Sequence, residues 1–295
     1  MPTDFTVQDH HILHFTKNVE LLLQQKQPVL SGTSSTASYN GEGAQAIKQF
    51  GEVEFQSFNP GVAAGQWKGD TVWSDIEHFQ RWLFPSDFAL SLPAAKGDDL
   101  RMLGDPRSAY AEAMRAAYAR RYDDLIIAAA TNDARTGKFD DLQTTPFPTG
   151  QIIADGGTGL TLAKMNQARE MLLAAHNDPG EQRFLAMSQK QLSELLNTDE
   201  ITNADYNTIR ALVRGEVDSF LGFKFIFTER LLNTGNVRHC LAWVKSGLHF
   251  GTWNNLETHI DRRPDKNYVW QIWMSFTAGA TRTQEKKVVQ INCTE

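Results

Sequence analysis

A long helix is the strongest structural signal in this sequence. Between residues 108 and 130, Tyr110, Met114, Tyr118 and Tyr122 recur every four residues, and charged side chains occupy other faces. This spacing predicts an amphipathic helix, which at ~1.5 Å per residue is roughly 35 Å long. Such a helix is long for a domain of this size. We predict that its aromatic stripe is a packing face rather than the lining of a ligand pocket.

The part of the chain that precedes this helix is poorly suited to form a core of its own. Residues 12–23 predict at most one short helix, and the small polar stretch 31–36 predicts an extended arm. Such an arm is ordered only where another part of the protein holds it. We therefore treat residues 1–50 as an N-terminal arm.

Residues 51–92 have the pattern of a long hairpin. Val53 and Phe55 alternate with polar residues, which predicts a strand, and a second extended stretch follows at 75–84. Between the two stretches lies a predicted turn that contains three glycines, Gly61, Gly65 and Gly69.

After the long helix, strands and helices alternate to the C-terminus. This pattern predicts a mixed α+β fold with at least two packed regions. The predicted elements are strands at 151–154, 183–187, 223–227, 240–245, 248–253, 268–276 and 288–291, helices at 161–175, 188–196 and 204–213, and a turn at 279–282. The strands at 240–245 and 248–253 are predicted to form a pair around Ser246 and Gly247.

Composition excludes several protein classes. The net charge of −6 argues against a protein whose main task is to grip nucleic acid phosphates. The longest apolar run is 125–130, far short of the ~20 residues of a membrane helix. Two isolated cysteines, Cys240 and Cys293, support neither a zinc site nor a disulfide framework. No secretory signal is recognisable, so we expect a cytoplasmic, reduced protein.

No group of residues predicts catalysis, and none predicts a metal or cofactor site. The loop 155–159 stands where a dinucleotide loop would stand, but its spacing differs, so we interpret it as a structural turn. His11 and His14 lack further ligands for a metal. Asp123 and Asp124 point in different directions on the helix; we expect one to pair with a neighbouring arginine and the other to be solvated.

Several segments carry a resemblance to a known family. The clearest is DDLRMLGDPRSAY at 98–110, which leads into RRYDDLIIAAA at 120–130. This run resembles the "spine" helix and its lead-in in the major capsid proteins of tailed bacteriophages with the Hong Kong 97-type fold. Further segments follow in the family's order: 183–188, 203–207, 215–217, 220–225 and 279–282. The resemblance covers roughly residues 50–295.

The resemblance implies a domain layout. Residues 1–50 would be the N-terminal arm and 51–95 the extended hairpin called the E-loop. Residues 96–150 would be the peripheral (P) domain with the spine helix, 151–252 the axial (A) domain, and 253–295 the strands that return to the P domain.

The resemblance also implies a function and partners. The chain would assemble with copies of itself into the hexamers and pentamers of an icosahedral shell that encloses double-stranded DNA without sequence-specific binding. A scaffolding protein, a portal and a decoration protein would be further partners, with no cofactor and no membrane. The subunit would be made in the bacterial host cytoplasm and would reside in the virion. The predicted inter-subunit contact residues are Trp67, Lys68, Trp73 and Trp82.

Two alternative functions remain open at this stage. One is a minor capsid or decoration protein. The other is a nucleotide-binding cytoplasmic enzyme that uses the loop at 155–159.

Overall fold

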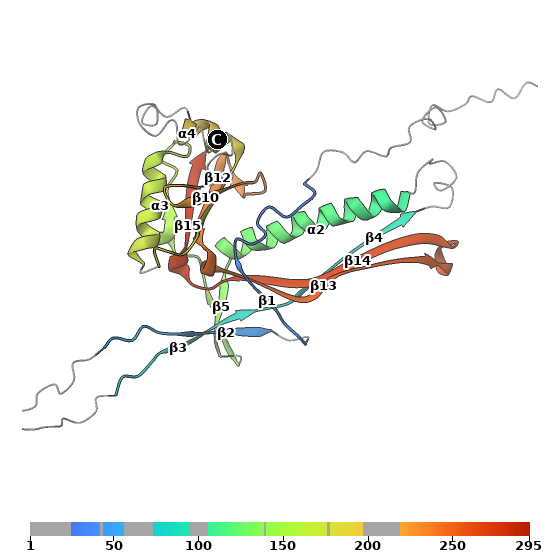
Figure 1. Cartoon of the computed structure of the whole chain (residues 1–295), viewed down its shortest axis with the longest axis horizontal. Helices are drawn as coiled ribbons and strands as arrows, with labels where there is room; N and C mark the ends of the chain where they lie inside the picture. Colours follow the sequence, from blue (N-terminus) through green and yellow to red (C-terminus); the bar gives the residue numbers. More distant parts are fainter. Residues whose placement is uncertain are drawn as a thin grey trace, which may run out of the picture.

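The chain folds into three sheets and three α-helices in the residues that the structure describes (Figure 1). This computed structural model describes residues 25–41, 44–55, 73–94, 106–138, 140–175, 178–196 and 219–295. The predicted helices at 12–23 and 204–213 and the glycine-rich turn at 61–69 lie outside these ranges. Within them, no helix is both long enough and apolar enough to cross a membrane.

The first sheet has four strands and lies along the longest helix, α2 (Pro106–Thr131) (Figure 1). Its order is β1 (Ser35–Ser38), β13 (Leu248–Arg263), β14 (Val269–Arg282) and β4 (Ser86–Ala94). β1 is parallel to β13, whereas the other pairs are antiparallel. The short 3₁₀ turn η5 (Pro264–Lys266) joins β13 to β14.

Helix α2 confirms the predicted helix and most of its packing stripe. Met114, Tyr122 and Ile126 are buried. Met114 packs with Ile272 and Met274, which both lie in β14. A second row of small residues is buried on another side of the helix because the arm covers it. This row comprises Ala116, Ala119, Asp123 and Ala130.

The second sheet has seven strands and contains much of the main core. Its order is β7 (Ile152–Ile153), β15 (Val288–Thr294), β12 (Val237–Val244), β8 (Arg183–Met187), β10 (Phe223–Phe227) and β9 (Ser219–Phe220), with β11 (Asn233–Thr234) beside β12. Helices α3 (Leu162–Ala174) and α4 (Gln189–Leu196) accompany it (Figure 1). Thr161 caps α3, because its side chain accepts the Lys164 backbone N–H.

The third sheet forms the base of the long hairpin. Its order is β2 (Gln45–Phe50), β3 (His78–Leu83), β5 (Ala134–Lys138) and β6 (Asp141–Thr145), all antiparallel. Three further 3₁₀ turns lie near the places where the sheets meet: η2 (Thr149–Gln151), η4 (Lys245–Gly247) and η6 (Glu285–Lys287).

Four sequence-based predictions of strands and turns differ from the structure. The first hairpin strand is β2, inside the predicted arm, and residues 51–55 are not a regular strand. β12 and β13 belong to different sheets rather than forming a pair, because η4 turns the chain from one sheet into the other. Residues 279–282 continue β14 instead of turning. The last strand, β15, pairs with β12 and β7 and not with the strands that the predicted layout places beside it.

Gly279 lies within β14, and its lack of a side chain makes room for a backbone segment that crosses the sheet. It lies opposite Gly251, and a Cβ on Gly279 would be 2.3 Å from the carbonyl oxygen of Phe84. These two glycines let the chain between β3 and β4 cross the sheet. A pattern of residue types does not separate such a glycine from a turn glycine.

We predict that Gly279→Ala destabilises the protein by about 3 kcal/mol, since the clashing atom is backbone and cannot rotate away. The matched control is Gly150→Ala, because a Cβ there meets no atom within 4 Å. Urea unfolding of both variants measures the effect. Equal free energies of unfolding for Gly279→Ala and Gly150→Ala would contradict the close approach of the Phe84 carbonyl to Gly279.

Candidate interaction surfaces

The outer ends of β2 and β3, with the segments that continue them, project from the body as a ribbon (Figure 1). We define the ribbon as residues 50–55 and 73–79; the hydrogen bond from Gly51 N to Glu77 O, 2.7 Å, joins its two sides. Its apolar side chains are exposed: Phe55 fully, Trp73 to 89% and Phe50 to 67%. Val53, Ile76 and Phe79 are also exposed. Apolar groups gathered on a projecting element mark an interaction surface.

The four predicted contact residues have different surroundings. Trp67 and Lys68 lie outside the described residues. Trp73 lies on the ribbon and is exposed. Trp82 lies at the hairpin base, where its indole N–H donates to the carbonyl of Gly137 at 2.7 Å, so it also has a role inside its own chain. A contact with another subunit stays a prediction for all four.

The arm is held against α2 by the carboxylate of Asp123, which is fully buried. It accepts the backbone N–H groups of Val29 and Leu30, both at 3.0 Å, and the side-chain amide of Gln25. Leu30 itself is completely buried in the main core. The expectation that the carboxylate without an arginine partner is solvated is therefore wrong: that carboxylate anchors the arm. No local pattern announces this, because its partners are more than ninety positions away.

The neighbouring Asp124 ties α2 to the second sheet. Its two oxygens accept Nε and Nη2 of Arg230, each at 2.6 Å. One of the two aspartates does pair with an arginine, but the prediction that this arginine is a neighbour is wrong, because Arg230 comes from the segment that follows β10. Two adjacent carboxylates thus attach two different parts of the chain to the same helix.

The arm continues along the first sheet and contacts both sheets. Trp243 of β12 donates its indole N–H to the carbonyl of Thr33 at 2.9 Å. Both ring nitrogens of His249 in β13 lie 2.8 Å from hydroxyl groups of the arm, Nδ1 from Ser35 and Nε2 from Tyr39. Residues 25–39 are therefore an integral part of the body.

This histidine gives the arm contact a pH dependence. Burial lowers the pKa of His249 below its ordinary value of 6.5, so the folded protein holds the ring neutral. Unfolding releases the ring to protonate at its ordinary pKa. Its contribution to stability is full above about pH 6.5 and is lost as the pH falls below that value.

We predict that the wild type loses more stability than His249→Gln between about pH 7.5 and about pH 5. Urea titrations at the two pH values measure this difference. Equal losses in the two proteins would show that this ring does not contribute.

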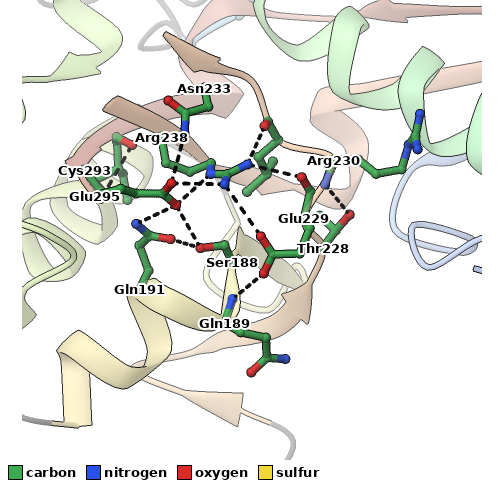
Figure 2. Close-up of polar contacts among 12 residues, drawn as sticks. Ser188, Gln189, Gln191, Thr228, Glu229, Arg230, Asn233, Arg238, Cys293 and Glu295 are labelled. Carbon is green, nitrogen blue, oxygen red and sulfur yellow. Dashed lines mark hydrogen bonds and ion pairs between the residues drawn. The ribbon is translucent and has the colours of Figure 1, made fainter. Parts of the chain in front are cut away.

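A polar network fixes the end of the second sheet that includes Glu295 (Figure 2). Arg238 of β12 donates Nε to Glu295 at 2.8 Å, and its Nη1 donates to the carbonyls of Glu229 and Leu231 at 3.2 and 3.0 Å. The Glu295 carboxylate also accepts the amide of Asn233 at 2.9 Å. Hydrogen bonding to Arg238 lowers the pKa of Glu295. The network saturates these groups with internal partners, which is typical of a structural role.

The backbone carbonyls of the loop 155–159 converge on the side-chain ammonium group of Lys164 of α3. Its ammonium donates to the carbonyls of Asp155, Thr158 and Gly159 at 2.7, 2.8 and 2.9 Å, and to that of Asn292 at 3.1 Å. The Asp155 carboxylate accepts the N–H of Gly157 at 3.3 Å. A phosphate-binding loop instead points free N–H groups at its ligand. The interpretation as a structural turn agrees with this geometry.

Two side chains that could carry chemistry lie together: hydrogen bonding to the thiol of Cys293, together with burial, raises the pKa of Cys240. Among the residues that the structure describes, no three of the metal-ligating types cluster. Cys240 and Cys293 are both buried free thiols. His11 and His14 lie outside the described residues.

Comparison with known proteins assigns the chain to a family. The sequence profile of the phage capsid protein family matches residues 7–295. The chain belongs to the phage capsid protein family. No curated protein matches it in sequence.

Solved capsid structures share the fold of this capsid protein. A chain of the cyanophage Pam1 capsid asymmetric unit is 10% identical, with a TM-score of 0.72, and the match covers 100% of this chain and 98% of that one. The capsid of Ralstonia phage GP4 gives 12% identity, a TM-score of 0.70, and coverage of 95% and 94%. The capsid of cyanophage P-SCSP1u gives 16%, 0.66, and coverage of 95% and 93%. The predicted fold class is confirmed.

Family membership changes how the exposed ribbon is interpreted. A capsid protein is a structural component of the virion. A capsid is assembled from copies of such a protein. The apolar side chains of the ribbon are exposed among the described residues of the single chain. A second copy of the chain could cover them.

Proposed function

We propose that this capsid protein is the major shell subunit of a tailed phage, and that it forms the hexamers and pentamers of an icosahedral head around double-stranded DNA. The observation that carries the proposal is the projecting ribbon, on which Phe55 and Trp73 are almost fully exposed in the single chain. In water such a surface favours association. In a shell, each ribbon would be covered by the adjacent subunit.

Ring formation follows from where the ribbon lies. A hairpin that reaches away from the body contacts a different surface on its neighbour, which makes the contact heterologous, or head-to-tail. Heterologous contacts generate closed rings when their rotation closes. Trp67, Lys68, Trp73 and Trp82 are proposed to lie in this contact. Isologous pairing of two ribbons would instead stop at a dimer.

The remaining roles follow from the same proposal. A scaffolding protein and a portal would guide assembly, a decoration protein could bind the finished shell, and DNA would be enclosed without sequence-specific contacts. The net charge of −6 supports a wall that does not grip DNA. The subunit would be synthesised in the host cytoplasm and would have no enzymatic activity; the closed loop at Lys164 argues against the nucleotide-dependent alternative.

Assembly of the purified chain tests this proposal. Sedimentation and negative-stain microscopy, with the chain alone and with a co-expressed scaffolding partner, should show rings and shell-like particles. Monomers that persist in every condition would contradict it. A minor or decoration protein would instead bind preformed shells at low copy number without forming them.

A further inference from the structure

The segment 282–287 is the point where all three sheets are tied together. Arg282, at the end of β14, donates Nη1 to the carbonyls of Ala130 and Asn132 at the end of α2, at 3.0 and 2.9 Å. Thr283 accepts Nε of Arg81 from β3 at 3.1 Å through its carbonyl. The base of the hairpin is therefore fastened to the link between the first and the second sheet.

The charges at this junction do not balance. Arg81 and Arg282 share the carboxylate of Glu285, with Nη2 of Arg81 at 2.8 Å and Nε of Arg282 at 3.9 Å from Oε1. The two arginine side chains are 7% and 0% exposed. Burial lowers the pKa of Arg282, Glu285 opposes this effect, and Arg81 adds to it. Two buried cations thus share one ion-pair partner, Glu285, and the charge of Asp133 adds a smaller favourable effect at Arg282.

Two buried donors at the junction make no hydrogen bond to a described residue: Nη1 of Arg81 and Nε of Arg282, the latter 3.9 Å from Glu285. Nη1 of Arg81 is buried and makes no hydrogen bond in the part of the chain that the structure describes. Buried guanidinium groups normally satisfy such donors, because an unpaired one costs free energy. The unpaired Nη1 indicates that its partner is not among the described residues.

A hollow of about 490 Å³ lies beside Arg81 and gives a ligand room to approach. It occupies the fork between β3 and β5, which pair only at Arg81–Thr136 and Trp82–Arg135. Its other walls include Gln49, Gln80, Lys138 and Glu285. Lys138, which lies opposite Asp141 in the register of β5 and β6, adds a second cation to these walls.

The chemistry of the missing partner follows from the arginine. The planar guanidinium matches a carboxylate, which can accept from it with two oxygens. The ribbon of this same chain carries four exposed carboxylates: Glu52, Glu54, Asp75 and Glu77. None of them forms an ion pair with a described residue. A neighbouring copy would therefore present both apolar side chains and anions.

We propose that the hollow beside Arg81 is a carboxylate-binding site, and that an acidic side chain from the ribbon of a second copy occupies it during assembly. This inference rests on the proposed shell function and adds the specific polar contact. Such a contact couples assembly to the junction of the three sheets, because the incoming anion completes the charge of the Arg81–Glu285–Arg282 cluster.

Two variants separate the two sides of this contact. The ribbon variant Glu52→Gln/Glu54→Gln/Asp75→Asn/Glu77→Gln removes the anions and touches no internal partner. The receptor variant Arg81→Lys keeps the charge but removes the planar group. Glu170→Gln, an exposed neutralisation on α3, is the control. Circular dichroism and thermal unfolding confirm that each variant is folded.

Purified wild type with no other protein present should assemble, as should the control, whereas each variant alone should assemble at least tenfold more slowly. An equimolar mixture of the two variants restores one intact contact per pair. Native mass spectrometry should then show 1:1 dimers of ribbon variant and receptor variant early, with closed rings forming as slowly as for either variant alone, because every further contact lacks one side.

The outcomes separate this inference from the proposed function. If the wild type assembles neither alone nor with a scaffolding partner, the proposed function fails. If the wild type and the ribbon variant assemble at the same rate, the carboxylate contact is wrong and the shell function stands. If neither variant assembles and their mixture gives no dimers, the two sites do not meet and the contact is likewise refuted. A receptor variant that does not fold is replaced by Arg81→Gln in the same mixture.

Discussion

Asp123→Ala is expected to lower the free energy of unfolding by about 4 kcal/mol. The substitution leaves the backbone N–H groups of Val29 and Leu30 without their acceptor, and Leu30 lies inside the core. Each buried donor that loses its acceptor costs about 1–3 kcal/mol, and more where the acceptor was charged. The arm should detach, so hydrogen exchange in residues 25–39 should rise together with the loss of stability. Urea unfolding and hydrogen exchange measure both effects.

The adjacent Asp124→Ala is the matched control. Its ion pair with Arg230 is about one-third exposed on each side, and such pairs contribute about 0–1 kcal/mol. A loss at position 124 as large as that at 123 would contradict the distinct roles assigned to these carboxylates. Unchanged exchange in residues 25–39 of Asp123→Ala would show that other contacts hold the arm.

Phe50→Ser/Phe55→Ser/Trp73→Ser is expected to abolish assembly and to leave the subunit folded. These side chains are exposed in the single chain, so their loss should change its stability little. Burial of each at a contact would contribute about 2 kcal/mol, or about 6 kcal/mol for the three. This corresponds to a more than ~10⁴-fold weaker association at every contact. Analytical ultracentrifugation measures the shift from particles to monomers.

Leu232→Ser provides the control for removing an exposed apolar side chain elsewhere. Leu232 is exposed but lies beside β11, away from the ribbon. This variant should assemble like the wild type. Normal particles from the triple variant would rule out the ribbon as an assembly contact.

The parts of the fold with strong local periodicity could be predicted from the sequence. Helix α2 and strands β8 and β10 lie where the residue spacing places them, because the apolar face of each element is set by neighbours in sequence. The sheet assignment of β12 and β13 could not be predicted this way. Both are apolar strands separated by a short turn, and only their distant partners place them in different sheets.

The functional surfaces were predictable in part. Exposed aromatic residues within a hairpin pattern indicated an interaction surface at Trp73. The anchors Asp123 and Glu285 were not predictable, because a carboxylate on a charged helix face and one in a Glu-Lys-Lys turn look solvated in sequence. Their burial depends on Val29, Leu30 and Arg81, which lie far away along the chain.

The central claim is that the ribbon of one subunit is covered by its neighbour in a closed shell. Cryo-electron microscopy of particles assembled from the purified chain tests it most directly. The account predicts that the side chains of Phe55 and Trp73 are buried against an adjacent subunit. Shells in which both side chains still face solvent would contradict it.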